Sequence, residues 1–187
     1  GAVSLREIVL QAGANVAAAH YHFGSKDELI HQVFTRRAKP VLAQTEQLIE
    51  EAQRFVGAPD YLERVITAII TPSIPGRSSG DDGVGIFNQL RAHLFVENRQ
   101  ATESVYLEPA SHMLAALRLA LPGMSANELA WKLHIMFSTL TATTTWVGRI
   151  LPALSGTYRP DDSDEALAYL VPLFATLLRA PLPFETK

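Results

Sequence analysis

The chain has 187 residues, of which 48% are hydrophobic, and it carries a formal net charge of −3. This length and apolar content are sufficient for a sizeable buried core, so the composition excludes an intrinsically disordered chain. The sequence contains no cysteine, which excludes disulfides, thiolate metal sites and thiol nucleophiles.

The N-terminal stretch predicts two short helices joined by a tight turn. Ser4 and Glu7 form a capping box, in which each side chain binds the other residue's backbone amide, and this box starts the first helix. Gly13 ends that helix, because glycine readily adopts a left-handed conformation. Asn15 is a good N-cap for a second helix through Phe23. About three residues separate the two helices, as in a helix-turn-helix.

A third helix is predicted to begin at a second capping box, formed by Ser25 and Glu28, and to run toward Lys39. Pro40 cannot donate a hydrogen bond to the preceding turn, so we expect it to kink this helix or to start a new helical segment. Helical periodicity then continues to Gly57.

The charge pattern divides the chain near this proline. Residues 1–39 carry five basic and three acidic side chains, so the rest of the chain must be acidic to give the net charge of −3. A mildly basic head on an acidic body suits a protein of which one end meets phosphate, although chance also explains so small an asymmetry. We therefore predict a head at residues 1–39 and a body at residues 40–187.

The body is predicted to be helical throughout, because no strand-like alternation or repeat is present. The predicted helices are residues 61–70 after an Asp60 cap, 86–99, 101–121 with a bend or restart at Pro109, 126–150 after a capping box of Ser125 and Glu128, and a last helix from Asp162 or Ser163 to 179 with a kink at Pro172. Residues 71–85 are rich in Gly, Ser, Pro and Asp, which predicts a mobile loop. The fold class is all-α.

Three short motifs resemble the DNA-binding half of the TetR family of bacterial repressors. They are His20-Tyr21-His22-Phe23-Gly24-Ser25-Lys26, Ala12-Gly13 and Leu5-Arg6-Glu7-Ile8. The resemblance implies a helix-turn-helix head with a ligand-binding and dimerisation body, and it places a further helix before Ser4. It also implies a twofold homodimer through residues 126–150 and 163–179.

The second helix is expected to act as the recognition helix. In a helix-turn-helix its first turn enters the major groove, so Val16 and Ala17 are expected to meet base edges. The resemblance implies further contacts to the bases or backbone of operator double-stranded DNA, from Ser4, Arg6, Asn15, His20, Tyr21, His22 and Lys26. Many family members have Leu-Tyr where this chain has Ala19-His20, which leaves the role of His20 open.

Apolar residues with a few polar ones on three body helices are typical of a small-molecule site. The residues expected to bind a small apolar effector are Phe87, Arg91, His112, Trp131, His134 and Ser138. An ordinary core with hydrogen-bonded histidines is the alternative for each of them. Trp131 also begins a W-x-x-H-x-M pattern, and some relatives that share it respond to fatty acids or acyl thioesters.

These features favour a ligand-responsive transcriptional repressor that binds its operator as a dimer and is released by a small apolar molecule. The alternative is a helical hydrophobe-binding carrier without DNA activity. A third hypothesis, an α-helical enzyme, lacks any nucleophile elbow or convergent catalytic spacing, so no catalytic residue is expected.

Metal, cofactor and membrane binding are not expected. His20 and His22 are two residues apart on a helix and do not face each other, and no other metal-ligand spacing occurs. No signal peptide is visible, and the most apolar long stretch, residues 129–147, contains Lys132 and His134, which argues against a membrane span. With no cysteine, the chain suits the reducing cytoplasm.

Overall fold

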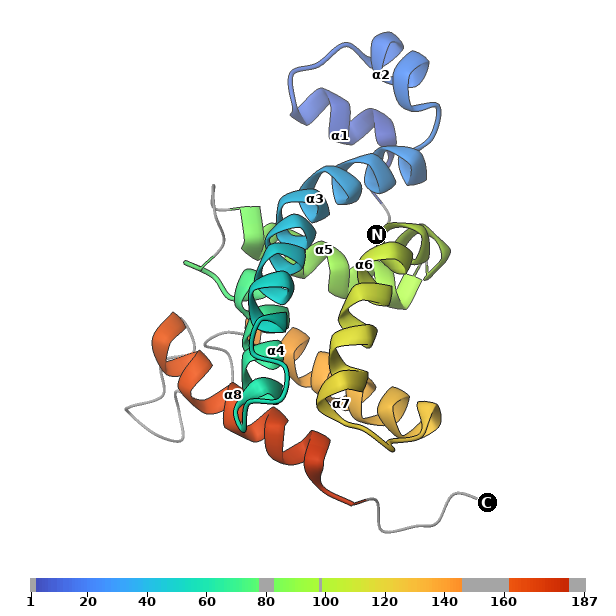
Figure 1. The fold of residues 1–187 in the computed structure, drawn as a ribbon. Coiled ribbons are helices and arrows are strands. Elements are labelled where there is room, and N and C mark those ends of the chain that lie inside the picture. The colour runs from blue at the N-terminus through green and yellow to red at the C-terminus, as the bar shows by residue number, and fades with distance from the viewer. Residues whose placement is uncertain (1–2, 78–82, 98, 146–161, 182–187) are drawn as a thin grey trace.

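The computed structural model describes residues 3–77, 83–97, 99–145 and 162–181. Within these ranges the chain forms α-helices and one short 3₁₀ helix without any strand, which confirms the all-α prediction. The elements are α1 (Leu5–Gln11), α2 (Val16–Phe23), α3 (Lys26–Gln53), α4 (Tyr61–Ile70), η1 (Thr71–Ser73), α5 (Gly83–Glu97), α6 (Arg99–Ala120), α7 (Ala126–Thr145) and α8 (Ser163–Arg179). Figure 1 shows α1 and α2 at one end of α3, with α4, α5 and α6 along its remaining length and α7 and α8 at the end of the molecule away from the head.

The predicted helix starts of the head are present. Ser4 and Glu7 form both halves of the capping box, with the Ser4 amide 2.7 Å from Glu7 Oε2 and the Glu7 amide 3.3 Å from Ser4 Oγ. Ser25 Oγ accepts from the Glu28 amide at 3.1 Å, but the Glu28 carboxylate accepts from Gln32. Ser25 therefore caps α3 without the return bond that a complete box requires.

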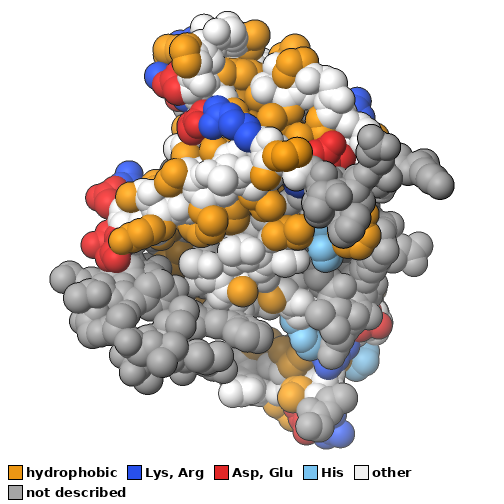
Figure 2. Space-filling model, turned by 90° about the horizontal axis from the view of Figure 1, so that it is seen from below, with side chains coloured by type: hydrophobic (Ala, Val, Ile, Leu, Met, Phe, Trp, Pro, Cys, Tyr) orange, Lys and Arg blue, Asp and Glu red, His pale blue; other side chains and the backbone are white. Residues whose placement is uncertain are grey.

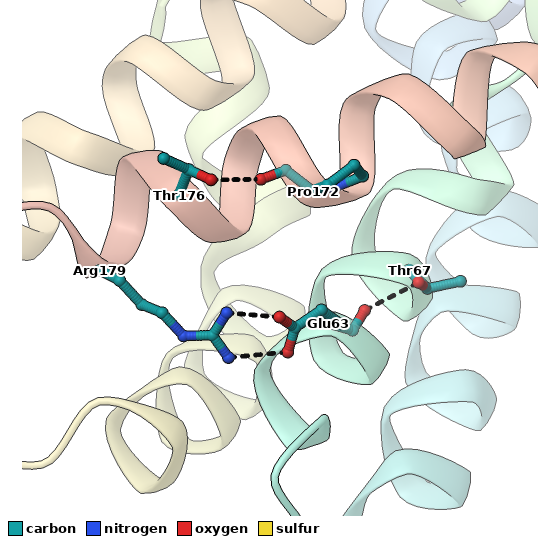
Figure 3. Close-up of polar contacts among 5 residues, drawn as sticks. All are labelled: Glu63, Thr67, Pro172, Thr176 and Arg179. Carbon is teal, nitrogen blue, oxygen red and sulfur yellow. Dashed lines mark hydrogen bonds and ion pairs between the residues drawn. The ribbon is translucent and has the colours of Figure 1, made fainter.

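Three helices pass through a proline without a break. The prolines are Pro40 in α3, Pro109 in α6 and Pro172 in α8. The expectation that Pro40 starts a new segment is wrong, because Ala38 and Val41, on either side of it, are buried in one apolar cluster and hold the helix together. In α8 the Pro172 carbonyl accepts from the Thr176 hydroxyl at 2.8 Å (Figure 3).

Helix α3 belongs to both the head and the body. The head cluster consists of the buried residues Leu5, Val9 and Ala19, with Val16, Phe23 and Leu29 packed against it. The α5 cluster consists of the buried residues Phe34, Ala38, Val41, Val84, Phe87 and Leu94. Packing therefore changes between Leu29 and Phe34, N-terminal to the boundary predicted at residue 39, while the helix itself continues.

The main core lies deeper in the body, where α4 packs between α3, α6 and α8. Its fully buried large side chains include Ile66, Leu117, Met136 and Phe174, one from each of α4, α6, α7 and α8. Burying a side chain of this size contributes about 1.5–3 kcal/mol. The main core is therefore the largest source of stability among the residues that the structure describes.

The segment after α4 is not the mobile loop predicted for residues 71–85. Residues 71–73 form η1, and Pro72, Ser73 and Ile74 are buried. The Ser73 carbonyl accepts from Asn88 Nδ2 of α5 at 2.7 Å. Glycine and proline content suggested mobility here, but tertiary packing of Ile74 overrides that local signal. Residues 78–82 lie outside the described ranges.

Polar contacts fasten both ends of α8 to the body. Arg77 Nε donates to Ser163 Oγ at 3.1 Å, and the Arg77 guanidinium forms an ion pair with Asp164. At the other end Arg179 donates two parallel hydrogen bonds to the Glu63 carboxylate of α4 (Figure 3), with 2.8 Å between Nη2 and Oε2. The position of α8 on the body is thus fixed at its first and last turns.

The Glu63–Arg179 pair makes stability depend on pH. The hydrogen bond from Arg179 lowers the pKa of Glu63 below its ordinary value of 4.5. The Glu63–Arg179 pair therefore stabilises the fold above about pH 4.5, and this stabilisation is lost as the pH falls through the lowered pKa of Glu63 in the folded state. We expect Glu63→Gln to cost about 0.5–1 kcal/mol at pH 7, because the pair is partly exposed, and measurably less at pH 3. Urea denaturation at both pH values measures this; equal losses would contradict it.

Lys132 is a buried cation at the junction of α7 and α8. Its side chain is 3% exposed, and Nζ lies 2.7 Å from Glu128 Oε1, one turn earlier on α7. Nζ also donates to the carbonyls of Leu178 at 2.9 Å and Ala180 at 2.6 Å, which end α8. Lys132 thus satisfies carbonyl groups that a helix C-terminus leaves without partners. Ser125 Oγ accepts from the Glu128 amide, so the predicted capping box is also half formed here.

Candidate DNA interface and body site

Helix α2, the expected recognition helix, is held against α1 by one apolar edge. Ala19 is buried with Leu5 and Val9 of α1, and Val16 and Phe23 are half-buried beside them. Val16, Ala19 and Phe23 recur at helical spacing on one side of α2. Val16 was expected to meet base edges, but its side chain packs on the head cluster, so Ala17 is the more accessible member of that first turn.

The opposite side of α2 faces solvent. Ala17, His20, Tyr21 and His22 are all exposed, and Tyr21 is 87% exposed. The Tyr21 and His22 rings make an edge contact, with 5.3 Å between their centroids. A large aromatic ring so exposed next to hydrogen-bond donors suits contact with a partner, and its hydroxyl and the imidazoles can donate to phosphate.

Two predicted contact residues are already engaged in helix caps. Asn15 Oδ1 accepts from the amides of Ala17 and Ala18, at 2.8 and 3.2 Å, which leaves the Asn15 amide nitrogen for another partner. Ser4 Oγ donates to Glu7 Oε2 at 2.7 Å, and the Ser4 hydrogen bonds lower the pKa of Glu7. The Glu7 carboxylate therefore occupies the N-terminus of α1, so a phosphate must displace it to reach Ser4.

Two cations border the exposed side of the head. Arg6 on α1 is exposed, and Lys26, in the first turn of α3, is half-exposed directly after the recognition helix. Asp27 and Glu28 follow in the same turn, so positive charge at this point comes from Lys26 beside two carboxylates. Long-range attraction of DNA to this end is therefore modest, and direct contacts have to provide most of the affinity.

The body residues predicted to bind a ligand are not brought together in one cavity. Phe87 and Arg91 are buried on α5. His112 is exposed on α6, and its Nδ1 lies 2.8 Å from Glu46 Oε1 of α3.

Trp131, His134 and Ser138 lie on one exposed face of α7, with an edge contact between the rings of Trp131 and His134. Their spacing was correctly recognised as one helical face. Sequence alone did not show that this face points outward, because that depends on which face the neighbouring helices α5 and α8 cover.

An open groove of about 530 Å³ lies between α3 and α6. It is lined by His31, Thr35, Lys39, Leu42, Ala43 and Glu46 of α3 and by Val105 and Glu108 of α6. The sequence analysis did not identify this groove. The spacing of the α3 residues does place them on one helical face, but no sequence signal identifies α6 as the other wall.

Helices α7 and α8 also leave large apolar side chains in solvent. Trp131 and Ile135 of α7 are 57% and 46% exposed, and Tyr169 and Leu173 of α8 are 71% and 54% exposed. Figure 2 views the molecule from the end where these helices lie and shows hydrophobic side chains over much of that surface. None of the helices within the described ranges combines the length and hydropathy needed to cross a membrane.

Comparison with known families agrees with the head and body seen in the structure. Residues 1–33 match the family of bacterial regulatory proteins, tetR family, and residues 67–176 match the tetracyclin repressor-like C-terminal domain. A comparison with curated proteins gives no match. The first match covers α1, α2 and the start of α3, and the second covers more than half of the chain. The chain therefore belongs to the TetR family of DNA-binding transcriptional regulators.

Proposed function

We propose that this regulator acts as a homodimer in the cytoplasm, represses transcription by binding operator DNA through α2, and is released by a small molecule bound in its body. The observation that carries the DNA-binding part is the solvent-facing row of Ala17, His20 and Tyr21 on a helix whose other side packs on α1. Such a helix can enter a major groove without losing its own core.

The exposed faces of α7 and α8 support the dimer. Helices α7 and α8 pack against each other, and each carries two large apolar side chains that are 46–71% exposed: Trp131, Ile135, Tyr169 and Leu173. A self-complementary pairing of the two helices with their copies forms a four-helix bundle, in which a stable interface buries about 2,000 Å² or more. The part of the predicted interface at residues 146–150 lies outside the described ranges.

The course of α3 supports coupling between body and head. This helix packs on the head cluster at Leu29 and on the α5 cluster from Phe34 onward. A ligand that changes the packing of α5 therefore acts on the helix that carries the head. By thermodynamic reciprocity, such a ligand weakens DNA binding by the same factor by which DNA weakens ligand binding.

Fluorescence anisotropy with DNA from upstream of the protein's own coding sequence tests this proposal. We expect a complex of two protomers per site that competes successfully with unrelated DNA. Equal affinity for unrelated DNA at physiological salt would contradict operator binding and favour the helical hydrophobe-binding carrier.

Variants of Lys26 and Ala17 distinguish a residue that positions the protein on the DNA backbone from a residue that reads the base sequence. Lys26→Ala is expected to weaken binding to every DNA sequence nearly alike and to reduce the slope of log affinity against log salt by about one, because one phosphate contact is lost. Ala17→Ser, the matched variant, is expected to change the order of preferred operators with little change in the salt slope. Affinities for an operator panel at several salt concentrations measure both effects. A change of preference in Lys26→Ala would contradict its assignment to phosphate.

A further inference from the structure

Four elements bring polar side chains together inside the body. Arg91 of α5 is 7% exposed, and its Nη1 and Nη2 lie 3.4 Å from Ser73 Oγ of η1 and 3.5 Å from Thr141 Oγ1 of α7. The fully buried Asn88, one turn earlier on α5, donates from Nδ2 to the backbone carbonyl of the same Ser73. Tyr106 of α6 lies close enough for the Arg91 guanidinium to affect its pKa. We call these five residues the Arg91 cluster.

The charge of the Arg91 cluster is not balanced among the described residues. The polar contacts of Arg91 there are to neutral hydroxyls at the long end of hydrogen-bond distance, together with the Phe87 ring, whose centroid is 5.4 Å from the guanidinium carbon. Removing a guanidinium from water is costly, and buried charges are ordinarily paired with a counter-charge. Among the described residues, the Arg91 cluster therefore lacks a counter-anion.

The unpaired polar atoms of the Arg91 cluster include a donor of the cation itself. Arg91 Nε is buried without a hydrogen-bond partner among the described residues, and so is the acceptor Asn88 Oδ1. The hydroxyls of Ser73 and Thr141 lie next to the guanidinium and can rotate to donate. A cation with an unused donor beside such hydroxyls matches a carboxylate, which accepts only.

The surroundings of the Arg91 cluster are apolar. Phe87 stacks on Phe34 with 5.6 Å between ring centroids, and Tyr106 lies 6.0 Å from Phe34. Leu42 and Val105 pack against the same α5 cluster, and both also line the groove between α3 and α6. The α5 cluster thus contacts both the groove and the Arg91 cluster, although no residue of the Arg91 cluster lines the groove.

We propose that Arg91 is the anchor for the carboxylate of a small organic acid whose apolar part packs on the α5 cluster. This inference rests on the proposed ligand response, and it assigns the chemical class of the effector and the residue that recognises it. The hydroxyls of Ser73 and Thr141 orient the carboxylate.

Binding of defined acids to the full chain without DNA tests the proposal. The probes are decanoate and 4-phenylbutyrate, each with its neutral amide, measured by calorimetry. Wild-type protein is expected to bind at least one acid at least about tenfold more tightly than its amide, and Arg91→Met is expected to remove this preference. Arg91→Lys keeps the charge but not the planar donor fork, so it should retain part of the preference. Arg118→Met, at an exposed position on α6, is the matched control and should behave as wild type.

Thermal unfolding without ligand distinguishes a ligand anchor from a structural ion. An anchor leaves an unbalanced buried charge in the free protein, so Arg91→Met should keep or raise Tm. A lowered Tm with unchanged preference for acid over amide would overturn the proposal, as would failure of both acids to bind at millimolar concentration. Chloride or phosphate binding that matches the acids in affinity and Arg91 dependence would also overturn it.

The experiment separates this site from the proposed function. Operator binding without any Arg91-dependent acid binding refutes the site and leaves repression intact. Arg91-dependent acid binding by a protein that does not discriminate operator DNA supports the site and refutes repression.

Discussion

Lys132→Met is expected to lower the free energy of unfolding by about 2–4 kcal/mol. This loss is larger than the one expected for Glu63→Gln. The substitution leaves the Glu128 carboxylate without its cation and the carbonyls of Leu178 and Ala180 without their donor. Breaking a buried pair on one side is strongly destabilising, because the remaining charge stays desolvated. Urea denaturation at one fixed protein concentration measures the loss.

Two further variants define the cause of that loss. Arg118→Met removes an exposed charge from α6 and should change stability by less than about 0.5 kcal/mol. Adding Glu128→Gln to Lys132→Met should recover part of the loss, because no unpaired carboxylate remains. A Lys132→Met protein as stable as the wild type would show that Lys132 does not hold the end of α8.

Ile135→Glu is expected to convert the proposed dimer to monomers at micromolar concentration. Ile135 lies 46% exposed on α7, one turn after the exposed Trp131, and in the proposed bundle two introduced carboxylates enter a buried interface. Burying unpaired like charges costs several kcal/mol, which corresponds to a rise of at least about a hundredfold in the dimer Kd. Sedimentation equilibrium measures the Kd, and operator affinity should fall with it.

Leu119→Glu is the matched control, because Leu119 is an apolar residue on α6 that is 56% exposed, at least as much as Ile135. It should remain dimeric and should bind operator like the wild type. Circular dichroism checks that both variants stay helical. A wild-type chain that sediments as a monomer at micromolar concentration would remove the basis for the bundle.

The local signals in the sequence predicted the head well. Capping residues act within one turn, so Ser4, Asn15 and Ser25 determine where α1, α2 and α3 begin without help from distant parts of the chain. The opposite holds for Pro40 and Ile74. Local rules allowed a new helical segment at the first and predicted a mobile loop around the second, and burial against residues far along the sequence overruled both.

The body site was harder to predict, because helical periodicity shows which residues share a face but not what covers that face. Trp131, His134 and Ser138 do share a face, but that face is exposed. Arg91 was recognised as a polar residue among apolar ones, whereas its contacts with Ser73 and Thr141 depend on elements 18 and 50 residues away. Lys132 was seen only as a charge that argues against a membrane span.

The head cluster is small, and this limits the local stability of α1 and α2 in the protein without DNA. It has three buried residues among those described, against twenty in the main core. Opening α1 and α2 therefore costs a fraction of global unfolding, so amide hydrogens there exchange by local fluctuations. Operator binding must supply the free energy that stops these fluctuations. A substitution that rigidifies the α1–α2 contact can therefore tighten operator binding without adding any contact to DNA.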